Sequence, residues 1–225
     1  TPTGGTTAFS AATGSSSITV TAVNDAPVNS MPGSYNINED SVPLTLIALS
    51  IADVDSASGS LTVTLSVDAG TLTALTGGGV TVSGSGTAAL SLSGTVANLN
   101  AFLSGGSVPL FHSPADFNGT VTLTMVTNDN GNTGSGGAKS DTDTCTINIA
   151  AVNDEQVLAS NTGITVAEDS TANTITNGML LTTDVDNTAA QLVYTITSAT
   201  TTGTLRLSGM ALSIGSTFTQ ASINS

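Results

Sequence analysis

Val23-Asn24-Asp25-Ala26-Pro27 begins a series of short motifs that decides the fold of this chain. The series continues with Asn38-Glu39-Asp40 and Asp53-Val54-Asp55, and it recurs as Val152-Asn153-Asp154, Glu168-Asp169 and Asp184-Val185-Asp186. The offset is 129 positions from Val23 to Val152 and from Glu39 to Glu168, and 131 from Asp53 to Asp184. Self-similarity at a fixed period indicates an array of one structural unit.

The repeat divides the 225 residues into one nearly complete unit and parts of two others. Residues 23–152 form the complete unit, residues 1–22 correspond to the last loop and strand of a preceding unit, and residues 153–225 begin the next. We therefore predict that the chain is a window on a longer tandem array. The alternative is a filament subunit whose neighbour inserts residues 1–22 as a donated strand.

Small β-branched residues and glycines dominate the composition, which favours short strands and turns over helices. Strict alternation predicts a half-buried strand over residues 61–67. Other alternating stretches predict strands over 18–22, 121–125 and 145–149, and a stretch of mixed pattern predicts one over 41–50. Apolar spacing over residues 95–103 predicts one short helix with Thr95 as its N-cap. About seven strands and one helix in the complete unit indicate an antiparallel β-sandwich.

Sixteen acidic residues stand against two basic ones, Lys139 and Arg206. Nucleic acid and anionic membrane surfaces are therefore not expected as partners, because both require clustered Lys and Arg. Five acids lie near the first copy of the motifs and six near the second, so eleven of the sixteen gather there. Grouped carboxylates must take up protons or bind cations. The alternative is a solvated acidic surface that keeps the protein soluble.

Other residues give no sign of catalysis or of membrane insertion. Cys145 is alone, so it forms no intrachain disulfide and is most simply a small buried apolar group. His112 is the only histidine, and no nucleophile or zinc motif accompanies it. The chain has no run of about 18 apolar residues, so we expect no membrane span. It also shows no signal peptide pattern, and we expect no enzymatic activity.

The order of these motifs resembles that of cadherin-like repeats of large bacterial surface proteins. In the complete unit the resemblance also includes Pro114-Ala115-Asp116-Phe117-Asn118-Gly119 and Asn128-Asp129-Asn130-Gly131. The second unit is more similar to the chondroitin sulfate proteoglycan type, through Asp184–Asp186, Leu192–Thr197, Gly203–Leu205 and Phe218–Asn224. The resemblance implies an all-β fold of tandem antiparallel Ig/cadherin-like β-sandwiches, each with one short helix. It also implies calcium ions at the junctions between units and an extracellular or cell-surface location.

Calcium takes six to eight oxygen ligands and tolerates irregular geometry, so loops can supply them. Asp-x-Asp in an extended chain directs both carboxylates to one side, where they can share an ion. At the junction before the complete unit, the expected ligands are Asn24, Asp25, Asp53, Asp55 and Asp129. At the junction that follows, the resemblance groups Glu39, Asn153, Asp154, Asp184 and Asp186, with Asp116 as a further candidate.

The alternative for each of these acids is a role in turn formation, since Asp and Asn side chains satisfy loop backbone groups. The linkers also contain fewer acids than vertebrate cadherin linkers, and an Asp-Arg-Glu-type segment is absent. Fewer ions per junction, or an unoccupied junction, are therefore alternatives.

The expected function is structural: a calcium-stiffened rod of tandem repeats in a bacterial adhesin, surface fibre or filament. Its expected partners are neighbouring repeats of the same or adjacent chains. The alternative is an adhesion module that binds a surface glycan or protein. An exposed aromatic cluster beside a groove would favour that alternative.

Overall fold

The computed structural model describes residues 16–56 and 58–224, so most of the predicted loop over residues 1–17 lies outside the described residues. The chain forms two compact units. Unit 1 contains the chain up to Ile37, with Ser41–Pro114 and Gly119–Ile149. Unit 2 contains the chain from Ala150 onward, together with Asn38–Asp40 and Ala115–Asn118. Two short segments from the first repeat thus belong to the same unit as the second copy of the motifs.

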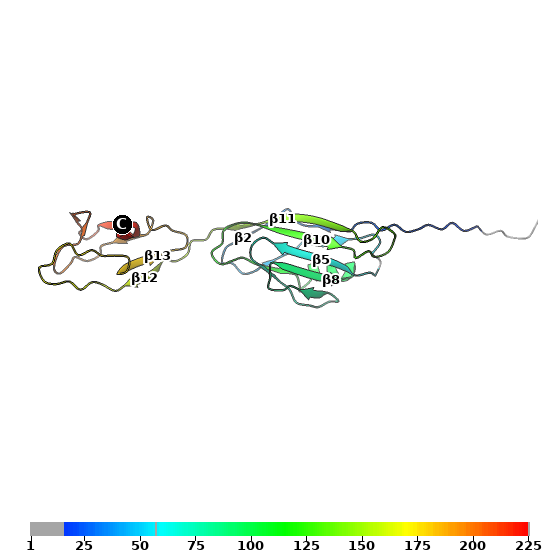
Figure 1. Cartoon of the computed structure of the whole chain (residues 1–225), viewed down its shortest axis with the longest axis horizontal. Helices are drawn as coiled ribbons and strands as arrows, with labels where there is room; N and C mark the ends of the chain where they lie inside the picture. The colour runs from blue at the N-terminus through cyan, green and yellow to red at the C-terminus, as the bar shows by residue number, and fades with distance from the viewer. Residues whose placement is uncertain (1–15, 57, 225) are drawn as a thin grey trace, which may run out of the picture. The chain divides into compact units, whose positions relative to one another are not determined.

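A six-stranded sheet with the order β2–β11–β10–β5–β8–β7 dominates unit 1 (Figure 1). Its strands are β2 (Ser34–Asn38), β5 (Leu61–Val67), β7 (Thr81–Ser83), β8 (Ala89–Gly94), β10 (Gly119–Asn128) and β11 (Ser140–Ala150). Smaller sheets pair β1 (Val28–Ser30) with β4 (Ser50–Ala52), and β9 (Leu110–His112) with both β3 (Leu44–Thr45) and β6 (Thr71–Thr73).

The strand predicted from strict alternation is β5, at the centre of the large sheet. Its apolar side chains are buried and its polar side chains are half-buried. Leu65 lies opposite Leu90 of β8 and Met125 of β10, and all three side chains are inaccessible to solvent. Period-2 patterning therefore places the core of unit 1 on one face of this sheet.

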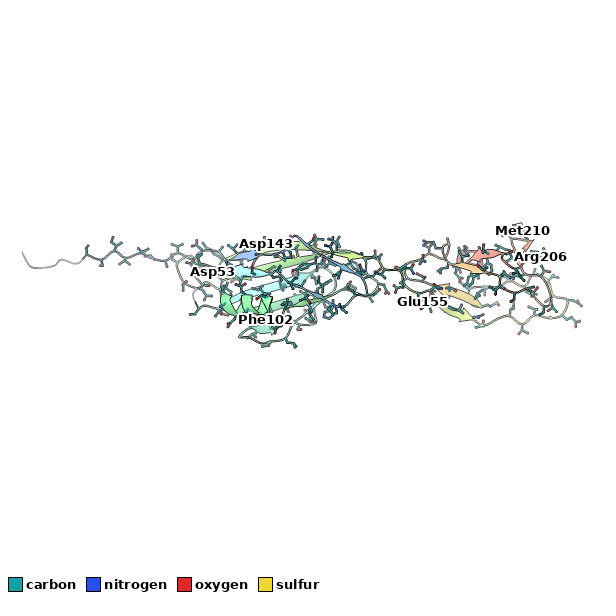
Figure 2. The ribbon with its side chains drawn as sticks, turned by 180° about the vertical axis from the view of Figure 1, so that it is seen from behind. Asp53, Phe102, Asp143, Glu155, Arg206 and Met210 are labelled. Carbon is teal, nitrogen blue, oxygen red and sulfur yellow. The ribbon has the colours of Figure 1, made fainter. Side chains whose placement is uncertain are left out.

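The predicted short helix is also confirmed, as α1 (Val96–Ser104). The side chain of Thr95 accepts a hydrogen bond from the backbone N–H of Asn98, which satisfies one donor of the first turn. Leu99, Phe102 and Leu103 are buried on the face that packs against β4 and β8 (Figure 2 labels Phe102).

Two predicted strands are wrong. Residues 41–50 form no single strand, because Ala48 adopts a positive φ of 63° and separates β3 from β4. Residues 18–22 form no strand within the described chain, and Ile18 and Val20 are 90% and 86% exposed. Alternation marks a segment that is able to pair, but a strand forms only where a partner edge is available.

Within the described residues, unit 2 contains three two-stranded pairs and a short helix. The pairs are β12 (Val157–Asn161) with β13 (Leu180–Thr183), β14 (Val193–Thr195) with β17 (Thr217–Thr219), and β15 (Arg206–Leu207) with β16 (Met210–Ala211). Helix α2 (Gln220–Asn224) follows β17 directly. The large apolar side chains Val157, Val193 and Met210 are more than half exposed.

The buried side chain of Gln220 organises the centre of unit 2. Its Oε1 accepts hydrogen bonds from the backbone N–H of Thr182 at 2.8 Å and from the Tyr194 hydroxyl at 2.6 Å. The Tyr194 ring stacks on Phe218, with 5.1 Å between the ring centroids. A polar side chain therefore ties α2 to β13 and β14.

Both units thus belong to the all-β class, with antiparallel pairing and one short helix in each. Cys145 is buried on β11, as predicted, and burial raises the pKa of its thiol.

Candidate cation sites

The predicted ligands form two groups, and the first lies within unit 1. Its central residue is Asp129, which follows β10 and is fully buried. Asp129 Oδ1 accepts hydrogen bonds from the backbone N–H groups of Gly131 and Lys139, both at 2.8 Å. Its Oδ2 accepts from the side-chain amide of Asn24 at 2.5 Å. Burial opposes ionisation, yet these hydrogen bonds and the charge of Lys139 outweigh it and lower the pKa of Asp129.

The Asp-Val-Asp motif of the first group forms a tight turn. Asp53 Oδ1 accepts hydrogen bonds from the backbone N–H groups of Asp55 and Ser56, at 2.9 and 3.0 Å. Asp55 Oδ2 accepts from the backbone N–H of Asp25 at 2.6 Å. The turn-forming role considered above is therefore real, but it uses only part of the oxygen set.

Two oxygen atoms of the first group are buried and lack a hydrogen-bond partner among the described residues. They are Asn24 Oδ1 and Asp53 Oδ2. Asn24 as a whole is only 1% exposed. Buried polar atoms are almost always hydrogen-bonded, and a hard cation such as calcium is a natural partner for unpaired carbonyl and carboxylate oxygens.

The second copy of the motifs repeats this local geometry in unit 2. Asp186 Oδ2 accepts a hydrogen bond from the backbone N–H of Asp154 at 2.7 Å, which matches Asp55 and Asp25. Asp184 Oδ1 accepts from the backbone N–H of Asp186 at 2.9 Å. The sequence repeat is therefore also a repeat of hydrogen bonds.

The second group gathers around Glu39, which is 2% exposed. Glu39 Oε1 accepts a hydrogen bond from the backbone N–H of Val152 at 2.8 Å, and Oε2 accepts from the Asn118 side-chain amide at 3.5 Å. The structure thus brings the acid of the Asn-Glu-Asp motif to the second Val-Asn-Asp motif.

Asp40, Asp116 and Asp154 form the closest carboxylate cluster of this group. One carboxylate oxygen from each lies within 4.8 Å of the other two. Asp40 and Asp116 both have a φ of 54°, a left-handed conformation that Asp and Asn adopt more readily than most residues. Three separate chain segments therefore contribute to one cluster of negative charge.

Electrostatic repulsion is visible at Asp154. Burial raises its pKa, and the carboxylates of Asp40, Asp186, Asp116 and Glu39 raise it further. Its Oδ2 is buried and lacks a hydrogen-bond partner within the described ranges. At Asp184, by contrast, burial is outweighed by hydrogen bonds from Asp186 and Asn187, which lower the pKa. A cation bound beside Asp154 would relieve the repulsion.

A shallow depression of about 290 Å³ lies next to the cluster in unit 2. Its walls include Asp116, Asp154, Glu155 and Asp184, and Figure 2 labels Glu155 there. The cluster is therefore accessible to an ion that retains some of its water.

Not every predicted ligand points toward its group. The Asn153 side chain donates a hydrogen bond to the backbone oxygen of Asp154 and accepts one from Asn187. Asp25 is exposed, and its bond to Asp55 uses its backbone N–H. Asp40 was not among the ligands expected from the sequence, yet it lies in the cluster. Its position directly after Glu39 in the motif was the available signal.

Residues 157–225 match a cadherin-like family model. The match begins at β12, and it supports a cadherin-like domain in unit 2. Cadherin-like domains are adhesion or structural modules, and they generally bind calcium. A comparison with curated proteins found no match to this chain. Within the described part of the chain, no helix combines the length and the hydrophobicity needed to cross a membrane.

Proposed function

We propose that this chain is a structural module of an extracellular rod, in which calcium ions stiffen the junctions between successive cadherin-like units. The observation that carries the proposal is the cluster of Asp40, Asp116 and Asp154. These carboxylates come from three separate segments, and the nearby Asp186 and Glu39 increase the negative charge. An ion held there would tie the three segments together.

The chemistry of the donor set favours calcium over a transition metal. All candidate ligands are carboxylates or amide carbonyls, which are hard oxygen donors. For the cluster in unit 2 the proposed ligands are Glu39, Asp40, Asp116, Asp154, Asp184 and Asp186. Extracellular calcium modules typically have a Kd of roughly 10⁻⁴ to 10⁻³ M, so occupancy would follow extracellular calcium.

A second ion is proposed for the first group. There the unpaired buried oxygens of Asn24 and Asp53 accompany the ionised Asp129. Asp55 would add a further carboxylate oxygen to this irregular oxygen shell. The two groups would then mark successive junctions of a tandem array in a bacterial adhesin, surface fibre or filament, with neighbouring repeats as partners.

A glycan-binding or protein-binding role has less support. The stacked pair of Tyr194 and Phe218 is an aromatic cluster, but both rings are only half-exposed. The Tyr194 hydroxyl is engaged with Gln220 and Thr182 inside unit 2. These rings therefore have a structural role that accounts for their positions.

Thermal unfolding with calcium and with a chelator tests the calcium claim. An ion that binds only the folded state at about 100 times its Kd stabilises it by roughly 2.7 kcal/mol, so the melting temperature should rise. Magnesium at the same concentration should have a smaller effect, because it demands octahedral geometry. Identical curves in calcium and chelator would contradict the proposal.

Small-angle scattering tests the rod: an elongated particle in calcium is expected, and a compact one would contradict it.

A further inference from the structure

The chain that enters unit 1 is held by the glycine-rich loop between β10 and β11. The backbone N–H of Asn24 donates to Ser135 O, and the N–H of Ser135 donates to Ala22 O, both at 2.9 Å. Val23 and Ser135 form an isolated parallel β-bridge. The loop over residues 129–139 therefore offers a short edge on which the entering segment pairs.

The loop also recognises the side chain of Asn24. The Asn24 amide nitrogen donates to Asp129 Oδ2 at 2.5 Å and to Gly137 O at 2.9 Å. Both partners are acceptors, and one is a buried carboxylate with a lowered pKa. An Asn in this position fits, whereas an Asp would direct a second carboxylate at Asp129.

The same Val-Asn-Asp sequence supplies an internal comparison in unit 2. Both copies make the same backbone contact with the Asp-x-Asp turn. The N–H of Asp154 donates to Asp186, as the N–H of Asp25 donates to Asp55. Asn153, however, is exposed, whereas Asn24 is buried. The motif alone therefore does not bury its Asn side chain.

We propose that residues 129–139 of unit 1 form a receptor loop for a Val-Asn-Asp linker segment, and that this latch closes without any cation. The hydrogen bonds of residues 22–25 to the loop and to Asp55 include no atom that requires an ion. The latch therefore fixes the position of residues 22–25 on unit 1 before an ion binds. The proposal does not rest on the proposed calcium function.

Gly134 provides the sharpest test, because an added Cβ there would lie 2.5 Å from Asn24 N and 2.6 Å from Val23 C. Its φ of 115° resembles that of Gly136, 124°, where an added Cβ meets nothing within 4 Å. Gly136→Ala therefore introduces similar backbone strain without the collision, and it is the matched control for Gly134→Ala.

The readout is amide hydrogen exchange of the full chain in chelator. Gly134→Ala should accelerate exchange at Asn24 and Ser135 at least tenfold, whereas Gly136→Ala should leave both near wild type. Amides of β5 and β10, such as that of Met125, should remain protected in both variants, which shows that the sandwich is intact. Equal protection in the two variants, or equal loss, would overturn the latch.

Asn24→Asp is a second test that needs no change in the loop. It replaces the amide donor with a carboxylate facing Asp129 and Gly137 O, so exchange at Ser135 should accelerate at least tenfold at neutral pH in chelator. Asn153→Asp makes the same change in the second, exposed copy and should leave Ser135 unchanged. Retained protection in Asn24→Asp would overturn recognition of the Asn. Both tests are made in chelator, so their outcomes do not depend on whether the wild-type chain binds calcium.

Discussion

Glu39 accepts a hydrogen bond from the backbone N–H of Val152, 113 residues further along the chain, at 2.8 Å. The carboxylate is almost completely buried, and its charge raises the pKa of Asp154. An acid in that environment is favourable only if something compensates its charge. The bond itself needs an acceptor oxygen, which a Gln also provides.

The effect of Glu39→Gln on stability should therefore differ between chelator and calcium. In chelator the variant should be at least as stable as wild type, because a repulsive charge is lost and the bond to Val152 is kept. In calcium its gain in melting temperature should be smaller than that of wild type. Glu168→Gln, the exposed counterpart 129 residues later, should behave like wild type in both. Equal destabilisation of Glu39→Gln in both media would contradict this account.

Asp40→Asn should weaken calcium binding about tenfold or more, since it removes one of three converging carboxylates. The backbone should tolerate the change, because Asn also adopts the positive φ of 54° found at Asp40. Asp169→Asn is matched in charge and in backbone, with a φ of 60°, and Asp169 lies outside the cluster. Isothermal titration calorimetry compares the two variants. Equal calcium affinities of the two variants would show that Asp40 is not a ligand.

Asp154 should make calcium binding sensitive to pH. Its pKa in the fold is raised, so its ionised form is disfavoured without an ion. In chelator, its contribution to stability should rise as pH falls from neutral through the raised pKa toward the ordinary value. Calcium affinity should fall over the same window, with proton release on binding. Asp154→Asn should be more stable than wild type in chelator at neutral pH, and that advantage should disappear below the window.

Asp129 should affect the pH dependence of stability in the opposite direction, so that unit 1 loses stability as pH falls. Its pKa is lowered in the fold, so its contribution to stability is present above the ordinary Asp value and is lost as pH falls through the lowered pKa. Asp129→Asn should destabilise unit 1 by roughly 1–3 kcal/mol at neutral pH, because buried donors lose a charged acceptor. Its acid unfolding should be shallower than that of wild type. Urea unfolding at several pH values measures both effects, and an unchanged stability at neutral pH would contradict them.

Local patterns in the sequence predicted much of unit 1. Alternation identified β5 because one face of that strand is buried, and spacing identified α1 because three apolar residues share its inner face. Pairing could not be predicted in the same way. The break at Ala48 depends on a single left-handed residue, and residues 18–21 meet no partner edge within the described part of the chain.

The candidate sites show the same limit. Repetition of Asp-Val-Asp predicted which acids share local geometry, and the matching hydrogen bonds of Asp55 and Asp186 follow from it. The approach of Asp40 to Asp116 and Asp154 depends on three chain segments that meet only in the folded chain. The burial of Asn24, in contrast to Asn153, depends on a loop more than one hundred residues away.

Equilibrium dialysis against calcium, followed by measurement of the metal content per chain, tests the central claim most directly. In millimolar calcium the wild-type chain should retain at least one ion above the buffer level. The combined variant Asp40→Asn, Asp116→Asn and Asp154→Asn should retain fewer, while Asp169→Asn should match wild type. A wild-type chain with no more calcium than the buffer, or with the same content as the triple variant, would contradict a calcium site at this cluster.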